Sequence, residues 1–256
     1  MLIDTHAHLY AEEFKKDIET VMARLQEAQV EKIYLPNIDH SSIDAMLELE
    51  QGYDFCIATM GLHPCSVDKN FEKELYLIEN WLQKRFFVAI GEMGTDLYWD
   101  KTFWEEQQEA FKIQARWAEQ YKIPLIIHSR NSIDETITLI ENLALPQLSG
   151  VFHCFTGTLE QAKKIKDMGF YLGIGGVVTY KNSDLPKILE QIDLSQLVLE
   201  TDSPYLPPTP HRGKRNEPAY IKLVAEKLAD IYQKSTEEIA QITRKNAYQL
   251  FNQVQK

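Results

Sequence analysis

The stretch Leu125-Ile126-Ile127-His128-Ser129-Arg130 is a short apolar run that ends directly in ionisable side chains. Runs of this kind recur along the whole chain, at residues 2–3, 32–35, 55–60, 88–90, 125–127, 151–152, 171–174 and 197–199. Longer segments with helical periodicity separate them, and this alternation is typical of repeated βα units. Because the runs are almost continuously apolar, they predict parallel strands that are covered on both faces.

The segments between the runs have the periodicity of amphipathic helices. Residues 11–28 and 104–120 are clear examples, and in the first of them Phe14, Ile18 and Val21 are three or four positions apart. A further helix is predicted over about 235–253, where it would pack on the outside. Eight strands with a helix after nearly every one favour an α/β fold of the (β/α)8 TIM barrel type, with an extra C-terminal helix, over an open doubly wound sheet.

The length and composition fit a single domain. The chain has 256 residues, of which 44% are hydrophobic, and α/β barrels use about 250 residues for one core. No Gly/Ser-rich linker divides the chain, and its densest proline cluster, at 204–210, follows the eighth run. We therefore expect residues 1–256 to form one domain.

The charge and the cysteines exclude several classes of protein. A net charge of −11 argues against a general nucleic-acid coat protein and against a binder of anionic membranes, because both depend on spread basic charge. Cys56, Cys65 and Cys154 have no paired spacing and are expected to be reduced thiols. With no secretory signal and no run near the roughly 20 apolar residues of a membrane helix, we expect a cytoplasmic protein without membrane contact or an obligate protein partner.

Ionisable side chains at strand ends predict a metal site. His6 and His8 close the first strand, and because alternate residues share a face, both imidazoles can reach one ion. Similar placements recur after later runs, at Glu92, His128, His153 and Asp202. In a barrel these strand ends meet on the C-terminal face, where active sites of this fold lie. The six side chains therefore favour a metal site over buried, satisfied histidines.

The donor types point to a catalytic site with two ions. Imidazole and carboxylate without thiolate suit zinc or manganese, whereas structural zinc usually takes cysteine. Six ligands exceed one tetrahedral ion but fit two ions about 3.5 to 4 Å apart that share a carboxylate. The expected arrangement is His6, His8 and Asp202 on one ion, His128 and His153 on the other, and Glu92 on both. Asp202 is also the candidate general base, Glu92 is the second candidate catalytic residue, and Asp4 is expected to orient His6.

Seven motifs closely resemble those of the TatD-type metal-dependent deoxyribonucleases. They are DTHAHL at 4–9, GLHP at 61–64, GEMG at 91–94, HSR at 128–130, HCF at 153–155, ETDSPYL at 200–206 and HRGKRNEP at 211–218. The motifs occur in order and at family spacing, and the resemblance runs from residue 2 to about 251. It implies an amidohydrolase-like TIM barrel, two divalent ions (zinc, manganese or magnesium) and hydrolysis of phosphodiesters, often as a 3′ to 5′ exonuclease that acts on DNA strand ends.

The chain departs from the family pattern beside the fourth strand. Relatives usually read Gly-Glu-Ile-Gly-Leu-Asp-Tyr, whereas this chain has Gly-Glu-Met-Gly-Thr-Asp-Leu-Tyr at 91–98. Thr95 and Leu97 replace residues beside the site, and the departure puts substrate preference in doubt more than metal binding. The aromatic side chains that follow, Tyr98, Trp99, Phe103 and Trp104, can stack on bases, although packing under the loop is as good an interpretation for the last two.

Five further residues are candidates for substrate binding. The resemblance implies that His63 contacts the substrate phosphate rather than an ion; the alternative is that it fixes the turn that follows it. Arg130 can present a guanidinium fork to phosphate or form a salt bridge at a helix start. Arg212, Lys214 and Arg215 follow the eighth strand, where barrels commonly hold phosphate, although a solvated loop would have the same composition.

Three functions remain open from the sequence. The leading one is a deoxyribonuclease that uses water activated by two metal ions. The alternative is a metal-dependent ester or amide hydrolase, such as an aminoacyl-tRNA deacylase, since the same activated water can attack an acyl carbon. Metal storage or scaffold binding is the non-enzymatic alternative, for which the sequence offers little. The native metal, the choice of DNA, RNA, nucleotide or acyl substrate, and the oligomeric state stay undetermined.

Overall fold

The computed structural model describes residues 1–251. Strands and helices alternate through this part of the chain. The strands are β1 (Leu2–Asp4), β2 (Val30–Pro36), β3 (Cys56–Thr59), β4 (Ile90–Asp96), β5 (Leu125–Arg130), β6 (Gly150–Phe152), β7 (Tyr171–Ile174) and β8 (Leu197–Leu199). The helices are α1 (Ile18–Glu27), α2 (Ile43–Gly52), α3 (Phe71–Lys84), α4 (Trp104–Tyr121), α5 (Ile133–Leu143), α6 (Leu159–Asp167), α7 (Leu185–Leu189), α8 (Ile221–Tyr232) and α9 (Thr236–Phe251).

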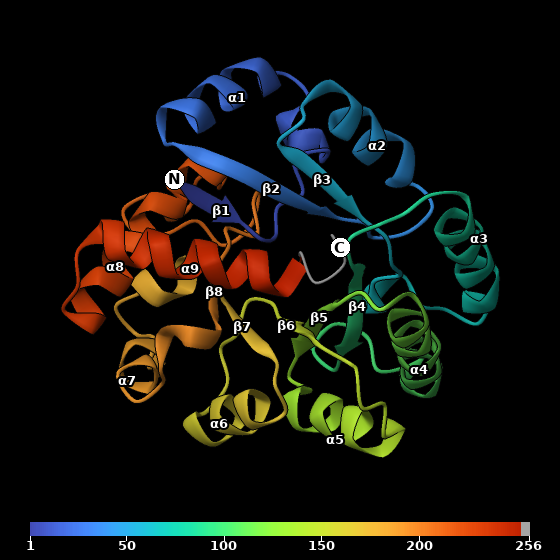
Figure 1. The fold of residues 1–256 in the computed structure, drawn as a ribbon. Coiled ribbons are helices and arrows are strands. Elements are labelled where there is room, and N and C mark those ends of the chain that lie inside the picture. The colour runs from blue at the N-terminus through green and yellow to red at the C-terminus, as the bar shows by residue number, and fades with distance from the viewer. Residues whose placement is uncertain (252–256) are drawn as a thin grey trace.

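The strands are parallel neighbours in chain order. Hydrogen bonds join them into two sets, β1-β2-β3 and β4-β5-β6-β7-β8. Parallel bridges connect the sets at Met60–Ile90 and at Ala7–Ser203. Helices α1 to α8 surround the strands (Figure 1). The chain therefore has the predicted (β/α)8 barrel architecture.

The strands are buried on both faces. Leu125 and Ile127 of β5 belong to the large core cluster that includes most of the apolar helix residues. Ile126, between them, belongs to a second cluster with Val151 of β6 and Val198 of β8. Since successive side chains of a strand point to opposite faces, the second cluster fills the inside of the barrel.

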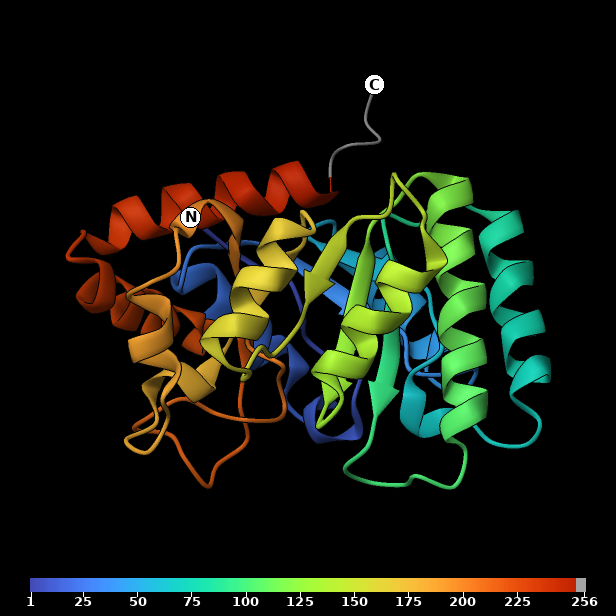
Figure 2. The same cartoon turned by 90° about the horizontal axis from the view of Figure 1, so that it is seen from below.

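Helix α9 closes one end of the barrel. Its residues Ala247, Leu250 and Phe251 join the interior cluster, and the ring of Phe251 stacks on that of Tyr34 at 3.9 Å. Figure 2 shows α9 across one end of the barrel, with long loops at the other end. The predicted helix over 235–253 exists, but it covers the barrel end instead of joining the outer ring; positions 252 and 253 lie outside the described residues.

Two predicted boundaries were wrong. The fourth strand was predicted at 88–90, but β4 spans Ile90–Asp96, because its pairing with β5 continues as far as Asp96 opposite Arg130. The helix predicted over 11–28 is divided into a short 3-10 turn at Glu12–Phe14 and α1, since a non-helical residue, Asp17, precedes Ile18. Within residues 1–251, no helix has both the length and the apolar character required to cross a bilayer.

Candidate metal centre

Strand alternation directs two predicted ligands into the barrel. Ile126 and Val151 face the barrel interior. Residues two positions apart on a strand face the same side. His128 and His153, which follow Ile126 and Val151 by two residues, therefore point into the end of the barrel opposite α9.

Glu92 of β4 lies at the centre of the resulting cluster, and its side chain is buried. Its Oε2 lies 3.1 Å from Nε2 of His6 and 3.5 Å from Nε2 of His8. Around Oε1 lie Nε2 of His153 at 2.9 Å, Nδ1 of His128 at 3.0 Å and Nε2 of His63 at 3.3 Å. Five imidazoles thus surround one carboxylate.

Asp202 completes the side of the cluster that contains His6 and His8. Its Oδ1 lies 3.5 Å from Nε2 of His8 and 3.8 Å from Nε2 of His6. The structure therefore brings all six predicted ligands together. Three groups of donor atoms lie within 4.8 Å of one another, namely His6–His8–Glu92, His6–His153–Asp202 and His63–Glu92–His128.

The contact of the outer ring nitrogen of His8 determines the tautomer of this ring. Nδ1 of His8 lies 2.8 Å from the hydroxyl of Tyr10, and this hydroxyl donates its hydrogen to the carbonyl oxygen of Pro36. Burial raises the pKa of Tyr10 well above its usual value, so the hydroxyl keeps its proton. Tyr10 therefore accepts a hydrogen bond from Nδ1 of His8, and the lone pair of Nε2 faces Glu92 and Asp202.

A carboxylate lies beside the outer ring nitrogen of both His128 and His153, but only His128 forms a hydrogen bond with it. Nε2 of His128 lies 2.9 Å from Oδ2 of Asp96, and Nδ1 of His153 lies 3.5 Å from Oε1 of Glu200. The hydrogen bond with Asp96 leaves the lone pair of Nδ1 of His128 to face Oε1 of Glu92, and Nε2 of His153 faces the same oxygen. Acceptors this close are stable only with a cation or a proton between them, so the donor set fits divalent metal ions.

The electrostatics of the cluster favour positive charge. Although burial raises the pKa of Glu92, the neighbouring histidines hold it well below its usual value. Burial lowers the pKa of His128 and His153, but Asp96 and Glu92 raise the first and Glu92 and Glu200 raise the second above the ordinary value. Protons and metal ions therefore compete for the same ring nitrogens.

His63 has the opposite tautomer. Its Nδ1 accepts a hydrogen bond from the backbone N–H of Cys65 at 3.0 Å, and burial lowers its pKa, which keeps the ring neutral. The remaining proton is then on Nε2, which faces Glu92 at 3.3 Å. His63 thus offers a hydrogen-bond donor at the centre, which supports substrate contact over metal ligation.

Comparisons with known proteins identify the family of the chain. The family described as TatD related DNase matches residues 3–252. The chain belongs to the TatD-related DNase family. It is 41% identical to the uncharacterized metal-dependent hydrolase YabD of Bacillus subtilis, over 98% of this chain and 99% of that protein. It is 33% identical to the metal-dependent hydrolase YjjV of Escherichia coli, over 98% of this chain and 97% of that protein.

Solved structures place this TatD-related chain in the same fold. The crystal structure of YjjV, a TatD homologue from Escherichia coli, superposes with a TM-score of 0.92 over 98% of both chains at 33% identity. A TatD family hydrolase from Entamoeba histolytica gives a TM-score of 0.82 at 23% identity, over 98% of this chain and 97% of that one. These similarities agree with the barrel architecture described above.

Asp4 supports the cluster through the backbone. Its buried carboxyl group accepts hydrogen bonds from the backbone N–H of His6 at 3.2 Å and of Thr201 at 3.0 Å, and from the Thr201 hydroxyl at 2.6 Å. Burial raises its pKa to about 8. Asp4 therefore joins the segment that carries His6 to the segment that carries Asp202, rather than contacting an imidazole.

Glu200 of the ETDSPYL motif is a further supporting residue. Its Oε1 accepts a hydrogen bond from the backbone N–H of Cys154 at 2.6 Å and lies beside His153. A Cβ atom at Gly173 would lie 2.2 Å from its Oε2. Two residues of the sequence therefore indicate this supporting contact, a glycine in β7 and an acidic residue directly after β8.

The structure separates the three basic residues of the 212–215 loop. Arg212 is exposed and its guanidinium lies 4.0 Å from the centre of the Tyr180 ring, and Lys214 is also exposed. Arg215 instead donates to both oxygens of Asp17, at 2.6 and 2.8 Å. This ion pair occupies the guanidinium group of Arg215. Arg215 therefore attaches the loop to the start of α1 and does not join Arg212 and Lys214.

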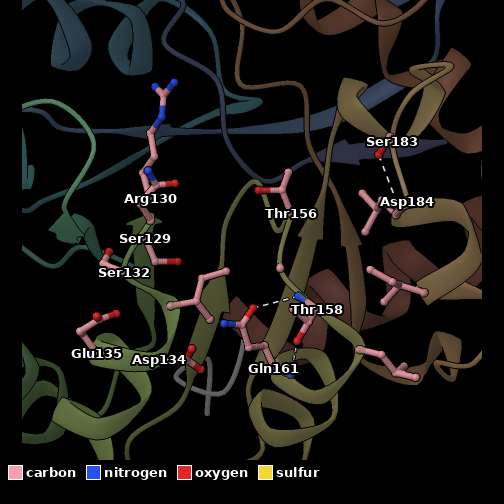
Figure 3. Close-up of a pocket in the computed structure, with 16 residues that line it drawn as sticks. Ser129, Arg130, Ser132, Asp134, Glu135, Thr156, Thr158, Gln161, Ser183 and Asp184 are labelled. Carbon is pink, nitrogen blue, oxygen red and sulfur yellow. Dashed lines mark hydrogen bonds between the residues drawn. The ribbon is translucent and has the colours of Figure 1, made fainter.

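Arg130 lies at the edge of a hollow beside the centre. The hollow has a volume of about 850 Å³ and lies among the N-terminal ends of α5, α6 and α7. The residues that line it include three acidic residues, Asp134, Glu135 and Asp184. In Figure 3 the Arg130 side chain points away from Asp134 and from the other labelled residues near the bottom of the hollow.

Proposed function

We propose that this chain is a metal-dependent deoxyribonuclease that removes nucleotides from the 3′ end of a DNA strand. The observation that carries the proposal is the Glu92 cluster, in which the inner nitrogens of His8 and His128 face carboxylate oxygens with their lone pairs and Nε2 of His153 lies 2.9 Å from Oε1 of Glu92. Membership of the TatD-related DNase family supports a nucleic-acid substrate. We also propose that residues 1–256 act as one hydrolase domain.

The cluster divides into two candidate ligand sets that share Glu92. His6, His8 and Asp202 would hold one divalent ion, and His128 and His153 would hold a second. Zinc, manganese and magnesium are the candidate metals. Bound divalent ions polarise a phosphoryl oxygen and lower the pKa of water, which is the chemistry that phosphodiester hydrolysis requires.

Two side chains have the accessibility needed for proton transfer and substrate contact. The side chain of Asp202 is 13% exposed, compared with 3% for Glu92. Although burial raises the pKa of Asp202, the neighbouring histidines hold it below its usual value. Asp202 is therefore ionised at neutral pH and can accept the proton of the attacking water. Nε2–H of His63 can donate to a phosphate oxygen.

The distribution of charge favours a strand end over a duplex. The chain as a whole has a net charge of −11, so phosphate is repelled from most of its surface. Arg130, Arg212 and Lys214 are exposed and are the candidate contacts for phosphate. Binding through so few cations is expected to be weak and sensitive to salt.

The test is hydrolysis of a 5′-labelled single-stranded DNA oligonucleotide by metal-loaded protein. We expect stepwise shortening from the 3′ end and release of mononucleotides, both abolished by a chelator and by Glu92→Gln. A wild-type protein that keeps its metal but releases no nucleotide would overturn the proposal. Release of an amino acid from aminoacyl-tRNA without oligonucleotide shortening would favour the ester hydrolase instead.

A further inference from the structure

We propose that Tyr98 and Trp99 form a stacking platform for an unpaired base of the strand that the centre hydrolyses. The inference rests on the proposed function, and it adds a specificity element outside the ligand cluster. A base-stacking surface beside the centre would make the enzyme depend on a nucleobase and prefer unpaired ends.

The two side chains are large, aromatic and exposed. Trp99 is 66% exposed and Tyr98 is 51% exposed. Their ring centres lie 5.0 Å apart and the ring planes are nearly perpendicular, at 87°. By contrast, Phe103 and Trp104, which follow in the same segment, are only partly exposed, and Phe103 packs against the core. Tyr98 and Trp99 are therefore the exposed members of this aromatic group.

Asp96 attaches the platform to the candidate metal centre. Its Oδ1 accepts hydrogen bonds from the backbone N–H groups of Tyr98 at 2.8 Å and Trp99 at 2.9 Å. Its Oδ2 lies 2.9 Å from Nε2 of His128, whose other nitrogen faces Glu92. A single carboxylate thus fixes both the loop conformation and a candidate ligand, so the aromatic pair has a defined position relative to the cluster.

A cation lies against the same aromatic pair. The guanidinium carbon of Arg130 is 3.9 Å from the centre of the Tyr98 ring and 5.2 Å from that of Trp99. A nucleotide combines an anionic phosphate with a base that has two aromatic faces. Arg130 beside exposed rings offers a partner for each part, because guanidinium binds phosphate and aromatic rings stack on bases.

The acidic residues of the neighbouring hollow disfavour a path of the DNA strand through it. Three carboxylates, Asp134, Glu135 and Asp184, line it beside α5, α6 and α7. Arg130 points away from Asp134 (Figure 3) and toward the Tyr98 ring. Phosphates are therefore repelled on the side of the hollow and attracted on the side of the platform.

The consequence is a preference for unpaired termini. In a duplex the terminal base is already stacked and paired, and it must be released before it can stack on Trp99. Stacking on an aromatic side chain tolerates every base. We therefore expect faster hydrolysis of single-stranded than of blunt duplex ends, with little dependence on the terminal base.

Steady-state kinetics on a single-stranded oligonucleotide test the platform. Trp99→Ala is expected to raise KM about 10-fold, in line with the loss of one base–aromatic stack, and Trp99→Phe should restore most of the affinity. Tyr76→Ala is the matched control, because Tyr76 is an equally exposed aromatic residue, at 65%, on α3. On an oligonucleotide with abasic 3′-terminal positions, the KM values of the wild type and Trp99→Ala should converge.

Fluorescence gives a readout that does not depend on turnover. The chain has four tryptophans, and binding of a phosphorothioate oligonucleotide, which resists hydrolysis, should quench the wild type but not Trp99→Phe. An unchanged KM in Trp99→Ala or undiminished quenching in Trp99→Phe would overturn the platform while leaving the nuclease proposal intact. If the wild type cleaves no DNA, the nuclease proposal fails, and fluorescence still decides whether Trp99 binds a base.

Discussion

Oδ2 of Asp96 lies 2.9 Å from Nε2 of His128, at the end of β4 and within β5. Burial raises the pKa of Asp96, but the hydrogen bonds from His128 and from the Tyr98 and Trp99 backbone lower it to about 2. Asp96 is therefore charged at neutral pH. It keeps a proton on Nε2 of His128, which leaves Nδ1 to face Glu92.

Asp96→Asn should weaken metal binding by about 10- to 100-fold, the usual effect of removing the partner that orients a ligating histidine. The asparagine amide has the same size as the carboxylate. If its oxygen keeps the hydrogen bonds to the loop, its NH2 group faces Nε2 of His128. This contact favours the tautomer of His128 that has no proton on Nε2. Isothermal titration with Zn²⁺ or Mn²⁺ measures the change. Asp100→Asn, on the same loop and exposed, is the control and should bind metal as the wild type does; equal affinities for all three proteins would contradict the assigned role of Asp96.

His63 and His153 should differ in their effect on metal content. Nε2 of each faces Oε1 of Glu92, but the N–H of Cys65 occupies Nδ1 of His63 and leaves a proton on its Nε2. We expect His153→Asn to lose one ion per chain and His63→Asn to keep both while its hydrolytic rate falls about 10²-fold or more, a loss typical of proton donation or acceptance. Elemental analysis of the purified variants counts the ions, and metal loss in His63→Asn would show that His63 is a ligand.

The ligand cluster could be predicted because it follows from local rules. An apolar run identifies a strand, and alternation then places His128 on the same face as the interior residue Ile126. Barrel topology then brings the predicted ligands together, because the C-terminal ends of all strands meet on one face. The length of β4 was missed because its later residues, such as Gly94 and Thr95, are not an apolar run; their strand character comes from pairing with β5.

Contacts between distant segments could not be predicted from one sequence. Arg215 belongs to a basic segment that is typical of a phosphate contact. Its partner Asp17 lies 198 positions away, and no periodicity connects the two. The position of α9 is a similar case. Its apolar spacing predicts a buried face, but only the open end of the folded barrel determines what that face covers.

The closure of the barrel by α9 predicts a loss of stability that is separate from the site. Leu250 is buried in the interior cluster, so Leu250→Ala should cost about 3 kcal/mol and lower Tm by roughly 5–15 °C for a chain of this size. Gln249→Ala, at the exposed neighbouring position, should change Tm by less than about 2 °C. Thermal unfolding followed by circular dichroism gives both values. A Tm for Leu250→Ala within 2 °C of the wild type would mean that α9 contributes little to the fold.

The ion pair of Arg215 and Asp17 predicts a small stability effect that depends on pH. The hydrogen bond from Arg215 lowers the pKa of Asp17 below 3.8, the ordinary value that applies to the unfolded chain. A lowered folded-state pKa stabilises the protein above the unfolded value, and this stability is lost as the pH falls through the folded value. Because the Asp17 side chain is 38% exposed, Arg215→Ala should cost about 1 kcal/mol or less at pH 7, or about 2–4 °C in Tm. The difference in Tm from the wild type should narrow as the pH drops below 3.8, whereas Arg116→Ala, which removes an exposed arginine of α4, should show no such change. A difference that stays constant with pH would mean that Arg215 acts through packing on the Phe14 ring, 4.6 Å from its guanidinium carbon, and not through Asp17.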